Sequence, residues 1–295
     1  MKRLPKLRTT AKAPDELSPD EIVETLLAET GAMGKLPTNE QKLLSFLQLK
    51  QLSFDFAEEF DFLPEKEELP NDLRAVLSVE DKIVATHAGL GIKRTRFSVL
   101  HEIGHYILPD HRQKLFPDTA ETLSWWTRSR LEKEANQVAA DLLFQANRFT
   151  EEAVSLPLSS RTAHDLAPKY GASYEATIRR YVERHVLPCA VIVYDKVSQG
   201  SDEVDPEDDQ YRIQYTIPSP AFSKRCFSRV KSDEEFSRGS EIFRVHGARD
   251  VGDILQTELV VERNDGPAWH FETEIFTNGY KIFQLLTREI KSKQG

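Results

Sequence analysis

Apolar residues in the first part of the chain recur mainly at helical spacing. Residues 1–17 have too few apolar groups to pack and are predicted to be a flexible tail, whereas residues 18–31 predict a helix with a capping box. A second helix is predicted to start with Thr38 as its N-cap. Residues 73–79 and 81–88 are short runs typical of strands, and they predict a small hairpin.

Two longer amphipathic helices are predicted next. Apolar residues recur every three to four positions from Thr95 to Leu108, and Pro109 is expected to end this helix. The segment 127–148 carries a stripe of small and apolar residues with the same period. We expect these two helices to pack against each other.

The pattern changes in the last part of the chain. Residues 158–186 predict two short helices around the turn sequence YGAS, which is the outline of a helix-turn-helix. After Pro188 the pattern becomes that of strands, with turns predicted at 264–266 and 278–279 and a final helix at 280–290. The predicted strands are 189–197, 210–217, 241–245, 257–263 and 269–276. The predicted fold class is therefore α+β, with a mainly helical first domain that contains a small sheet.

Composition narrows the class of protein. The 295 residues include 48 acidic and 39 basic side chains, and the net charge of -9 argues against a surface built throughout for nucleic acid. Cys189 and Cys226 are far apart, so neither a disulfide framework nor a thiolate zinc site is predicted, and a reducing cytoplasm is the expected location. Apolar runs are much shorter than a membrane span, so no membrane partner is expected.

The candidate chemistry lies in the sequence His-Glu-Ile-Gly-His at 101–105. Residues i and i+4 share one face of a helix, so His101 and His105 can bind one metal ion. Glu102 can then act as general base and acid on an attacking water, as in zinc metallopeptidases. The alternative, two ordinary packed or solvated histidines, is less favoured in this helical context.

The third metal ligand has a first candidate in His111. It follows His101 at the metzincin spacing, but Leu108 stands where that motif needs glycine, and Pro109 follows. Both methionines of the chain also precede the motif, so a downstream Met turn is missing. His111 is therefore predicted to be a loop residue beside the cleft.

A carboxylate from the helix at 127–148 is the favoured alternative. Glu132 lies closer to the apolar stripe of that helix than Glu134 does, so Glu132 is predicted as the third ligand and Glu134 remains the second candidate. Two histidines and one carboxylate are a usual zinc set, although these ligand types also suit manganese or iron.

These motifs resemble those of the ImmA/IrrE family of cytoplasmic metallopeptidases. RTRFSVLHEIGHYIL at 94–108 and EKEANQVAADLL at 132–143 match the two helical motifs of the family. Residues 143–145 read Leu-Phe-Gln where the family often has Leu-Met-Pro, and we expect this change to affect the substrate-facing wall rather than the metal centre. The site that the resemblance implies consists of His101, His105 and Glu132 as zinc ligands and Glu102 as catalytic acid and base.

The resemblance to the radiation-response branch of this family extends to the domain organisation. It implies a zincin-like peptidase domain over 18–150, a helix-turn-helix-like segment over 151–187 and a GAF-like α+β domain over 188–295. The implied activity is limited proteolysis of a helix-turn-helix transcriptional repressor, which would release stress-response or mobile-element genes.

A second class of function is a DNA-binding or antitoxin-like regulator whose metal site is structural. Arg179, Arg180 and Arg184 could contact DNA phosphates. Nearby acidic residues leave only a small excess of positive charge, so packing or a protein contact is favoured over direct DNA binding.

Overall fold

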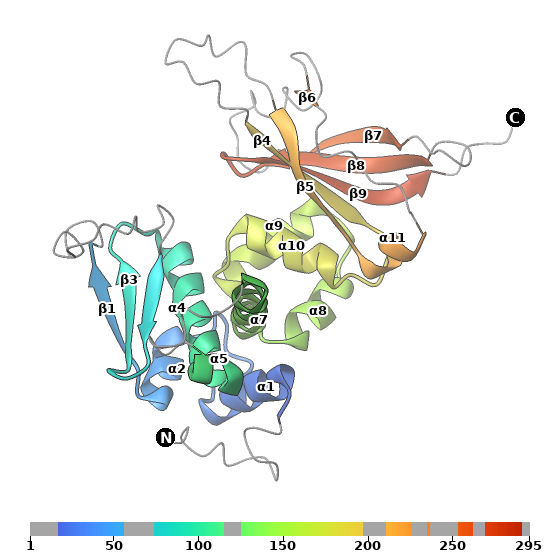
Figure 1. Cartoon of the computed structure of the whole chain (residues 1–295). Coiled ribbons are helices and arrows are strands. Elements are labelled where there is room, and N and C mark those ends of the chain that lie inside the picture. Colours follow the sequence, from blue (N-terminus) through green and yellow to red (C-terminus); the bar gives the residue numbers. More distant parts are fainter. Residues whose placement is uncertain are drawn as a thin grey trace, which may run out of the picture. The chain divides into compact units, whose positions relative to one another are not determined.

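The computed structural model describes residues 17–55, 74–114, 125–196, 211–225, 235–236, 253–261 and 269–290. Its helices are α1 (Pro19–Glu29), α2 (Glu40–Leu47), α4 (Ile92–Ile107), α5 (Pro109–Lys114), α7 (Trp125–Phe144), α8 (Asn147–Val154), α9 (Ser160–Tyr170), α10 (Tyr174–Glu183) and α11 (Pro220–Arg225). Its strands are β1 (Lys50–Phe54), β2 (Ala75–Ser78), β3 (Ile83–His87), β4 (Ala190–Lys196), β5 (Tyr211–Pro218), β6 (Glu235–Phe236), β7 (Leu255–Val261), β8 (Trp269–Thr277) and β9 (Ile282–Ile290). The predicted α+β class is confirmed (Figure 1).

The chain divides into two compact units. Unit 1 comprises residues 1–149 and 169–173, and unit 2 comprises residues 150–168 and 174–295. The domain boundaries expected from the sequence stay predictions. The expected tail lies outside the described residues except for Leu17, which is buried, and the expected strand at 241–245 also lies outside them.

Unit 1 contains a small sheet with the strand order β1-β3-β2. β2 and β3 pair in antiparallel fashion, which confirms the predicted hairpin, while β1 pairs with β3 in parallel and was not predicted. α4 follows β3 directly and contacts both β2 and β3 (Figure 1). The sheet therefore supports the helix that carries the His-Glu-Ile-Gly-His motif.

The first two helices begin at side-chain caps. Ser18 and Glu21 form the predicted capping box, in which each side chain accepts a hydrogen bond from the backbone amide of the other residue. The cap predicted for α2 was wrong by one residue, because Asn39 accepts from the amide of Lys42. The hydroxyl of Thr38 instead donates a hydrogen bond to the carbonyl oxygen of Leu142. Because of this tertiary contact, the side chain does not cap α2.

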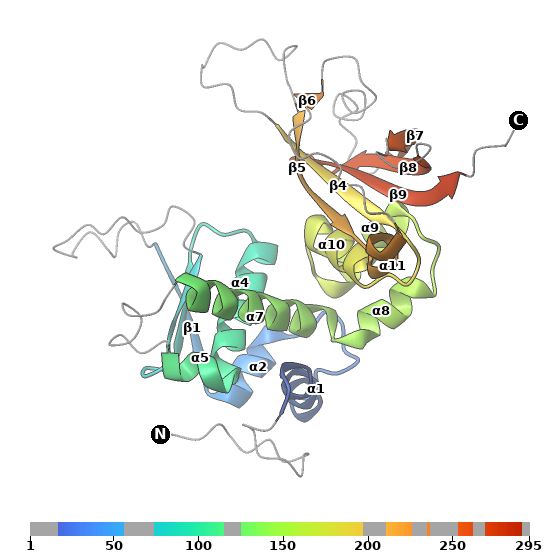
Figure 2. The same ribbon diagram turned by 45° about the vertical axis from the view of Figure 1, so that its right-hand side comes forward.

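α4 and α7 pack closely, as predicted, and in Figure 2 α7 is seen along its length across α4. Gly104 lies at the crossing: a Cβ atom at this position would meet the carbonyl oxygen of Ala135 at 3.1 Å and the Cβ of Val138 at 3.4 Å. α4 ends at Ile107 because Leu108 has the extended backbone (φ -75°, ψ 120°) that a following proline favours.

Unit 2 is built on a sheet with the strand order β6-β5-β4-β9-β8-β7, and α10 packs on β4 and β5. Both predicted short helices, α9 and α10, are present and lie on one face of this sheet (Figures 1 and 2). The turn predicted at 278–279 is confirmed, since Gly279 has a φ of 87° between β8 and β9.

The final helix predicted at 280–290 is wrong, because this segment forms strand β9. β9 lies between β4 and β8, so it is an interior strand. Five consecutive residues, 282–286, are buried, which means that both faces of the strand are covered. Such a strand reads as a nearly continuous apolar run, interrupted here by Gln284, and periodicity alone does not separate that run from a buried helix.

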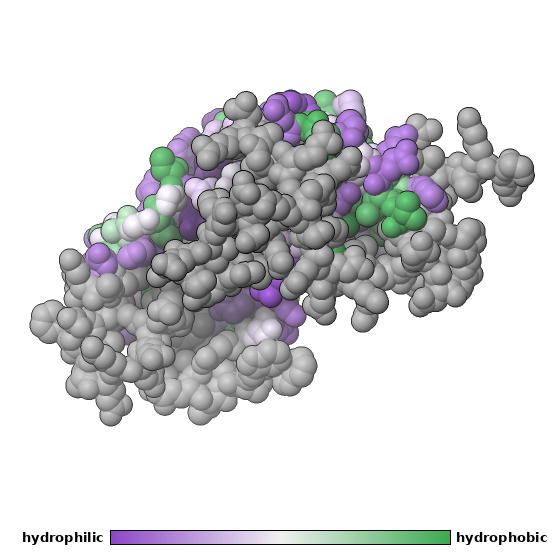
Figure 3. All heavy atoms as spheres, turned by 90° about the horizontal axis from the view of Figure 1, so that it is seen from above, coloured by the Kyte–Doolittle hydropathy of each residue, from purple (hydrophilic) through white to green (hydrophobic). Residues whose placement is uncertain are grey.

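The surface mixes polar and apolar groups. On the face seen in Figure 3, described hydrophilic residues are interspersed with smaller hydrophobic groups, which is ordinary for a protein surface. Within the described residues, no helix combines the length and the apolar character that a membrane crossing requires.

Candidate metal centre

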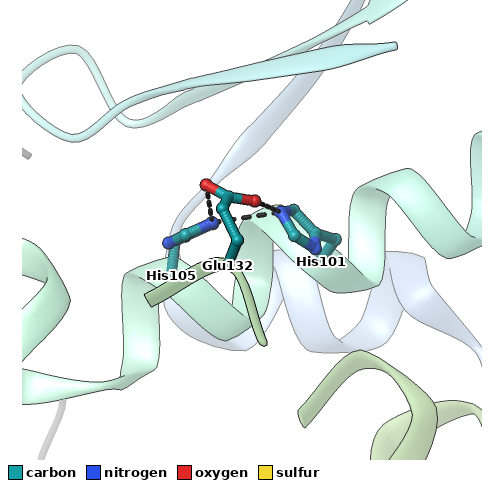
Figure 4. A group of neighbouring side chains, drawn as sticks. All are labelled: His101, His105 and Glu132. Carbon is teal, nitrogen blue, oxygen red and sulfur yellow. Dashed lines mark hydrogen bonds and ion pairs between the residues drawn. The ribbon is translucent and has the colours of Figure 1, made fainter. Parts of the chain in front are cut away.

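Three side chains from two helices converge in unit 1. His101 and His105 project from α4 and Glu132 projects from α7 toward them (Figure 4). The two Nε2 atoms lie 3.0 Å apart, and the Glu132 carboxylate oxygens lie 3.2 Å from Nε2 of His101 and 3.5 Å from Nε2 of His105. The structure thus brings together the three residues that the sequence proposed as metal ligands.

The spacing of these donor atoms suits a small divalent cation. Donors that bind zinc at 2.0–2.1 Å with tetrahedral angles lie about 3.3 Å from one another. The two Nε2 atoms lie 3.0 Å apart, and a carboxylate oxygen lies 3.2 to 3.5 Å from each of them, Oε2 from His101 and Oε1 from His105. Two imidazoles and one carboxylate would leave a fourth position for water or substrate, and the Glu132 side chain, 50% exposed, keeps one side of the group open to solvent.

The charges at the centre favour an anionic Glu132. The contacts of its carboxyl with the imidazoles of His101 and His105 hold the pKa of this carboxyl well below the usual range. Burial lowers the pKa of His101, but the hydrogen bond to Glu132 and the negative charges of Glu102 and Glu132 outweigh burial and leave this pKa raised. A bound cation would replace the proton that this negative cluster attracts.

Glu102 lies on α4 between the two histidines in sequence and is only 8% exposed. Burial raises the pKa of its carboxyl, and the charges of His101 and His105 oppose that shift only in part. A carboxylate whose pKa is raised toward neutrality is suited to take up and release a proton near neutral pH.

Each histidine is held through its other ring nitrogen. Nδ1 of His101 lies 3.1 Å from Oδ1 of Asn136 on α7, and Nδ1 of His105 lies 3.0 Å from Nδ1 of His111. Metal-binding histidines commonly donate this second N–H to a neighbouring acceptor, which orients the ring. The role of Asn136 was not predicted, although its position one turn after Glu132 was a sequence signal for it.

The prediction for His111 is corrected. It was expected in a loop, but it lies in α5 and is fully buried, with 0% exposure. Pro109 ends α4 and also occupies the first position of α5, where proline is well tolerated. Burial lowers the pKa of His111, and its Nε2 lies 3.0 Å from Oε2 of Glu134. The second candidate ligand, Glu134, therefore contacts His111 rather than the two histidines of the motif.

The departure from the family pattern at 143–145 was expected to alter a substrate-facing wall, but these side chains are buried in the structure. The ring of Phe144 packs against Phe149 and Tyr170. Gln145 donates to the carbonyl oxygens of Ala32 and Lys35 and accepts from an amide of the same loop. Residues 144 and 145 therefore stabilise the interior of unit 1.

The candidate DNA-contacting arginines of unit 2 are only partly available. Arg180 is buried, with 4% exposure, and Nε of Arg179 donates to Glu183 at 2.9 Å. α10, which would be the second helix of a helix-turn-helix, packs on β4 and β5 instead of presenting a free face of arginines. This burial weakens the case for direct DNA binding by α10.

Comparisons with known proteins agree with the motifs. Residues 65–181 match the family model of the M78 peptidases, described as an IrrE N-terminal-like domain. Among solved structures, a Mycobacterium tuberculosis transcriptional regulator has a similar fold, with a TM-score of 0.54 and 14% identity over 91% of this chain and 76% of that chain. No curated protein matches the chain in sequence.

Proposed function

From the membership of residues 65–181 in the M78 peptidase family, as an IrrE N-terminal-like domain, we propose that the chain is a zinc-dependent endopeptidase. The observation that carries the proposal is the convergence of His101, His105 and Glu132, whose candidate donor atoms lie close enough together to bind one metal ion. Manganese or iron would fit the same ligand types, and metal analysis of the purified protein separates these cases.

The chain's own residues supply the remaining parts of peptide hydrolysis. His101, His105 and Glu132 would hold the zinc ion, which would supply activation of the attacking water and polarisation of the scissile carbonyl. Glu102 takes a proton from the attacking water and delivers it to the leaving amine, and its buried position with a raised pKa suits both steps. Asn136 and His111 orient the rings of His101 and His105.

We propose that the substrate is a helix-turn-helix transcriptional repressor, whose cleavage releases stress-response or mobile-element genes. The resemblance to the ImmA/IrrE family supports this substrate class. The solved structure with a similar fold is itself described as a transcriptional regulator, which is in keeping with a role in gene control.

The test is cleavage of candidate repressors encoded beside the gene for this chain. Full-length protein with zinc should cut one of them at a defined site, and a chelator should abolish the cut. Glu102→Gln should retain zinc but slow cleavage by a factor of about 10² to 10⁴, because it removes the general base. Glu132→Gln should lose zinc and cleavage together, whereas Glu151→Gln on the exposed face of α8 should behave as wild type.

Cleavage that survives Glu102→Gln would overturn the mechanism. Stoichiometric zinc binding without cleavage of any repressor, together with salt-dependent binding to operator DNA that is unaffected by Glu102→Gln, would favour a DNA-binding regulator with a structural metal. Co-purification of an intact repressor would favour an antitoxin-like binding role.

A further inference from the structure

A chain of hydrogen-bonding groups leads away from the metal centre behind His105. Nδ1 of His105 lies 3.0 Å from Nδ1 of His111, and Nε2 of His111 lies 3.0 Å from Oε2 of Glu134. The other oxygen of Glu134 lies 3.2 Å from a guanidinium nitrogen of Arg130. His111 is fully buried, so its two ring nitrogens form hydrogen bonds with His105 and Glu134 rather than with water.

The order of groups fixes where the protons lie. A carboxylate only accepts hydrogen bonds, so the contact with Glu134 requires the proton of a neutral His111 to be on Nε2. Nδ1 of His111 then carries a lone pair and accepts from Nδ1–H of His105. With its proton on Nδ1, His105 has a free lone pair on Nε2, which is the atom that faces His101 and Glu132.

We propose that His111 and Glu134 are positioning residues that hold His105 in the Nδ1–H tautomer and thereby present its Nε2 to the metal. This inference rests on the proposed metal-dependent function. It assigns roles to two residues that touch neither substrate nor metal. In the usual arrangement a carboxylate hydrogen-bonds directly to the zinc-binding histidine. Here the imidazole of His111 lies between the carboxylate of Glu134 and His105.

The other histidine is oriented in a different way. Asn136 contacts Nδ1 of His101 through a carboxamide, which can present either its oxygen or its NH₂ group after a flip. A carboxamide alone therefore does not select one tautomer of His101. The carboxylate of Glu134 has no donor, so the path through His111 does select one for His105. Zinc affinity should accordingly depend on both His111 and Glu134.

The first experiment measures zinc affinity by competition with a chromogenic chelator at pH 7.5, using the full-length protein. His111→Ala should weaken binding by about 10-fold to 100-fold, the usual loss when such a partner is removed. His111→Gln should restore most of the affinity, because its carboxamide oxygen can accept from His105 while its NH₂ group donates to Glu134. Glu134→Gln should weaken binding by about 10-fold, because the new NH₂ group can donate to His111 and reverse the proton order. Glu151→Gln is the matched control for loss of one carboxylate.

The second experiment reads the tautomers directly in metal-free protein by long-range ¹⁵N–¹H correlation spectra of the imidazole rings. His111 should appear as the Nε2–H form and His105 as the Nδ1–H form, and Glu134→Gln should mix the two forms of His111. The same spectra show whether each variant is folded, so a loss of affinity in His111→Ala that comes only from destabilisation can be recognised. In that case His111→Gln and Glu134→Gln still test whether His111 and Glu134 set the tautomer of His105.

Wild-type zinc affinity in Glu134→Gln and His111→Ala, or an Nε2–H form of His105, would overturn the inference. The expected tautomers and affinity losses in a protein that cleaves no repressor would leave this inference standing and overturn only the proposed function.

Discussion

Substitution of Gly104 by alanine tests whether the close crossing of α4 and α7 sets the spacing of the metal ligands. Gly104 directly precedes His105, and Ala135, which it faces, lies three residues after Glu132. A side chain at Gly104 would therefore push on α7 about one turn away from the point where Glu132 meets the two histidines.

The size of the disturbance follows from the contacts. The new Cβ would lie 3.1 Å from the carbonyl oxygen of Ala135 and 3.4 Å from its Cα, and backbone atoms of a packed helix cannot rotate away as a flexible side chain can. α7 must then shift by a few tenths of an ångström. Metal–ligand distances tolerate a deviation of about 0.2 Å, so the shift exceeds what the centre accommodates without loss.

Two energies compete in the metal-free protein. Alanine favours a helix interior over glycine by about 1 kcal/mol, whereas overpacking of a close contact costs about 1 to 3 kcal/mol. We expect Gly104→Ala to lower the free energy of unfolding by up to about 2 kcal/mol. Zinc affinity should fall by about 10-fold, the loss that follows when a ligand is held in a poorer orientation.

The assay combines urea denaturation in chelator with zinc competition in buffer. Gly91→Ala is the matched control, since Gly91 is the N-cap of the same helix and an added Cβ meets nothing within 4 Å. It should alter stability slightly through the cap and leave zinc affinity unchanged. If Gly104→Ala bound zinc as tightly as Gly91→Ala does, the crossing would not control the metal centre.

Three further predictions concern pH and buried polar groups. Zinc affinity, measured by competition titration, should fall as pH drops from 7.5 to 5.5. The pKa of His101 lies above its ordinary 6.5, so a proton displaces the metal as pH falls through that raised value. An affinity that does not change with pH would contradict this prediction. Gln145→Ala should lower the free energy of unfolding, measured by urea denaturation, by about 2 to 4 kcal/mol, because the buried side chain of Gln145 binds two carbonyls and one amide of the segment 32–35. A loss below about 1 kcal/mol would show that water satisfies these groups in the variant. Glu274→Ala should destabilise unit 2 by about 2 to 3 kcal/mol in the same assay, because the buried carboxylate of Glu274 accepts hydrogen bonds from the amide and the hydroxyl of Ser160, the first residue of α9. Glu274→Gln should destabilise the unit less.

Much of the candidate site could be predicted because helix geometry is local. The i, i+4 spacing of His101 and His105 and the angular position of Glu132 depend only on residues within a few turns. The match of residues 65–181 to the M78 family confirms the resemblance that these motifs suggested. The predicted roles of the individual residues remain to be tested by the substitutions above.

The contacts of His111 could not be predicted in the same way. Pro109 was interpreted only as the end of a helix, although proline is also favoured at the first position of the next one. The partner of His111, Glu134, lies 23 residues further along the chain, and no local periodicity relates the two. Strand β1 was missed for a similar reason, because its parallel pairing with β3 joins residues that are far apart in sequence.

The second family motif can now be explained by the period of α7. The metal ligand of α7, the residue that packs against Gly104 and the residue that orients His101 lie at positions i, i+3 and i+4. This spacing places all three on one face of the helix. These residues are Glu132, Ala135 and Asn136. The facing stripe of α4 repeats the same intervals with His101, Gly104 and His105. A slip of one helix by a single turn would separate Gly104 from Ala135 and also carry Glu132 away from both imidazoles, so close packing and ligand convergence require the same register of the two helices.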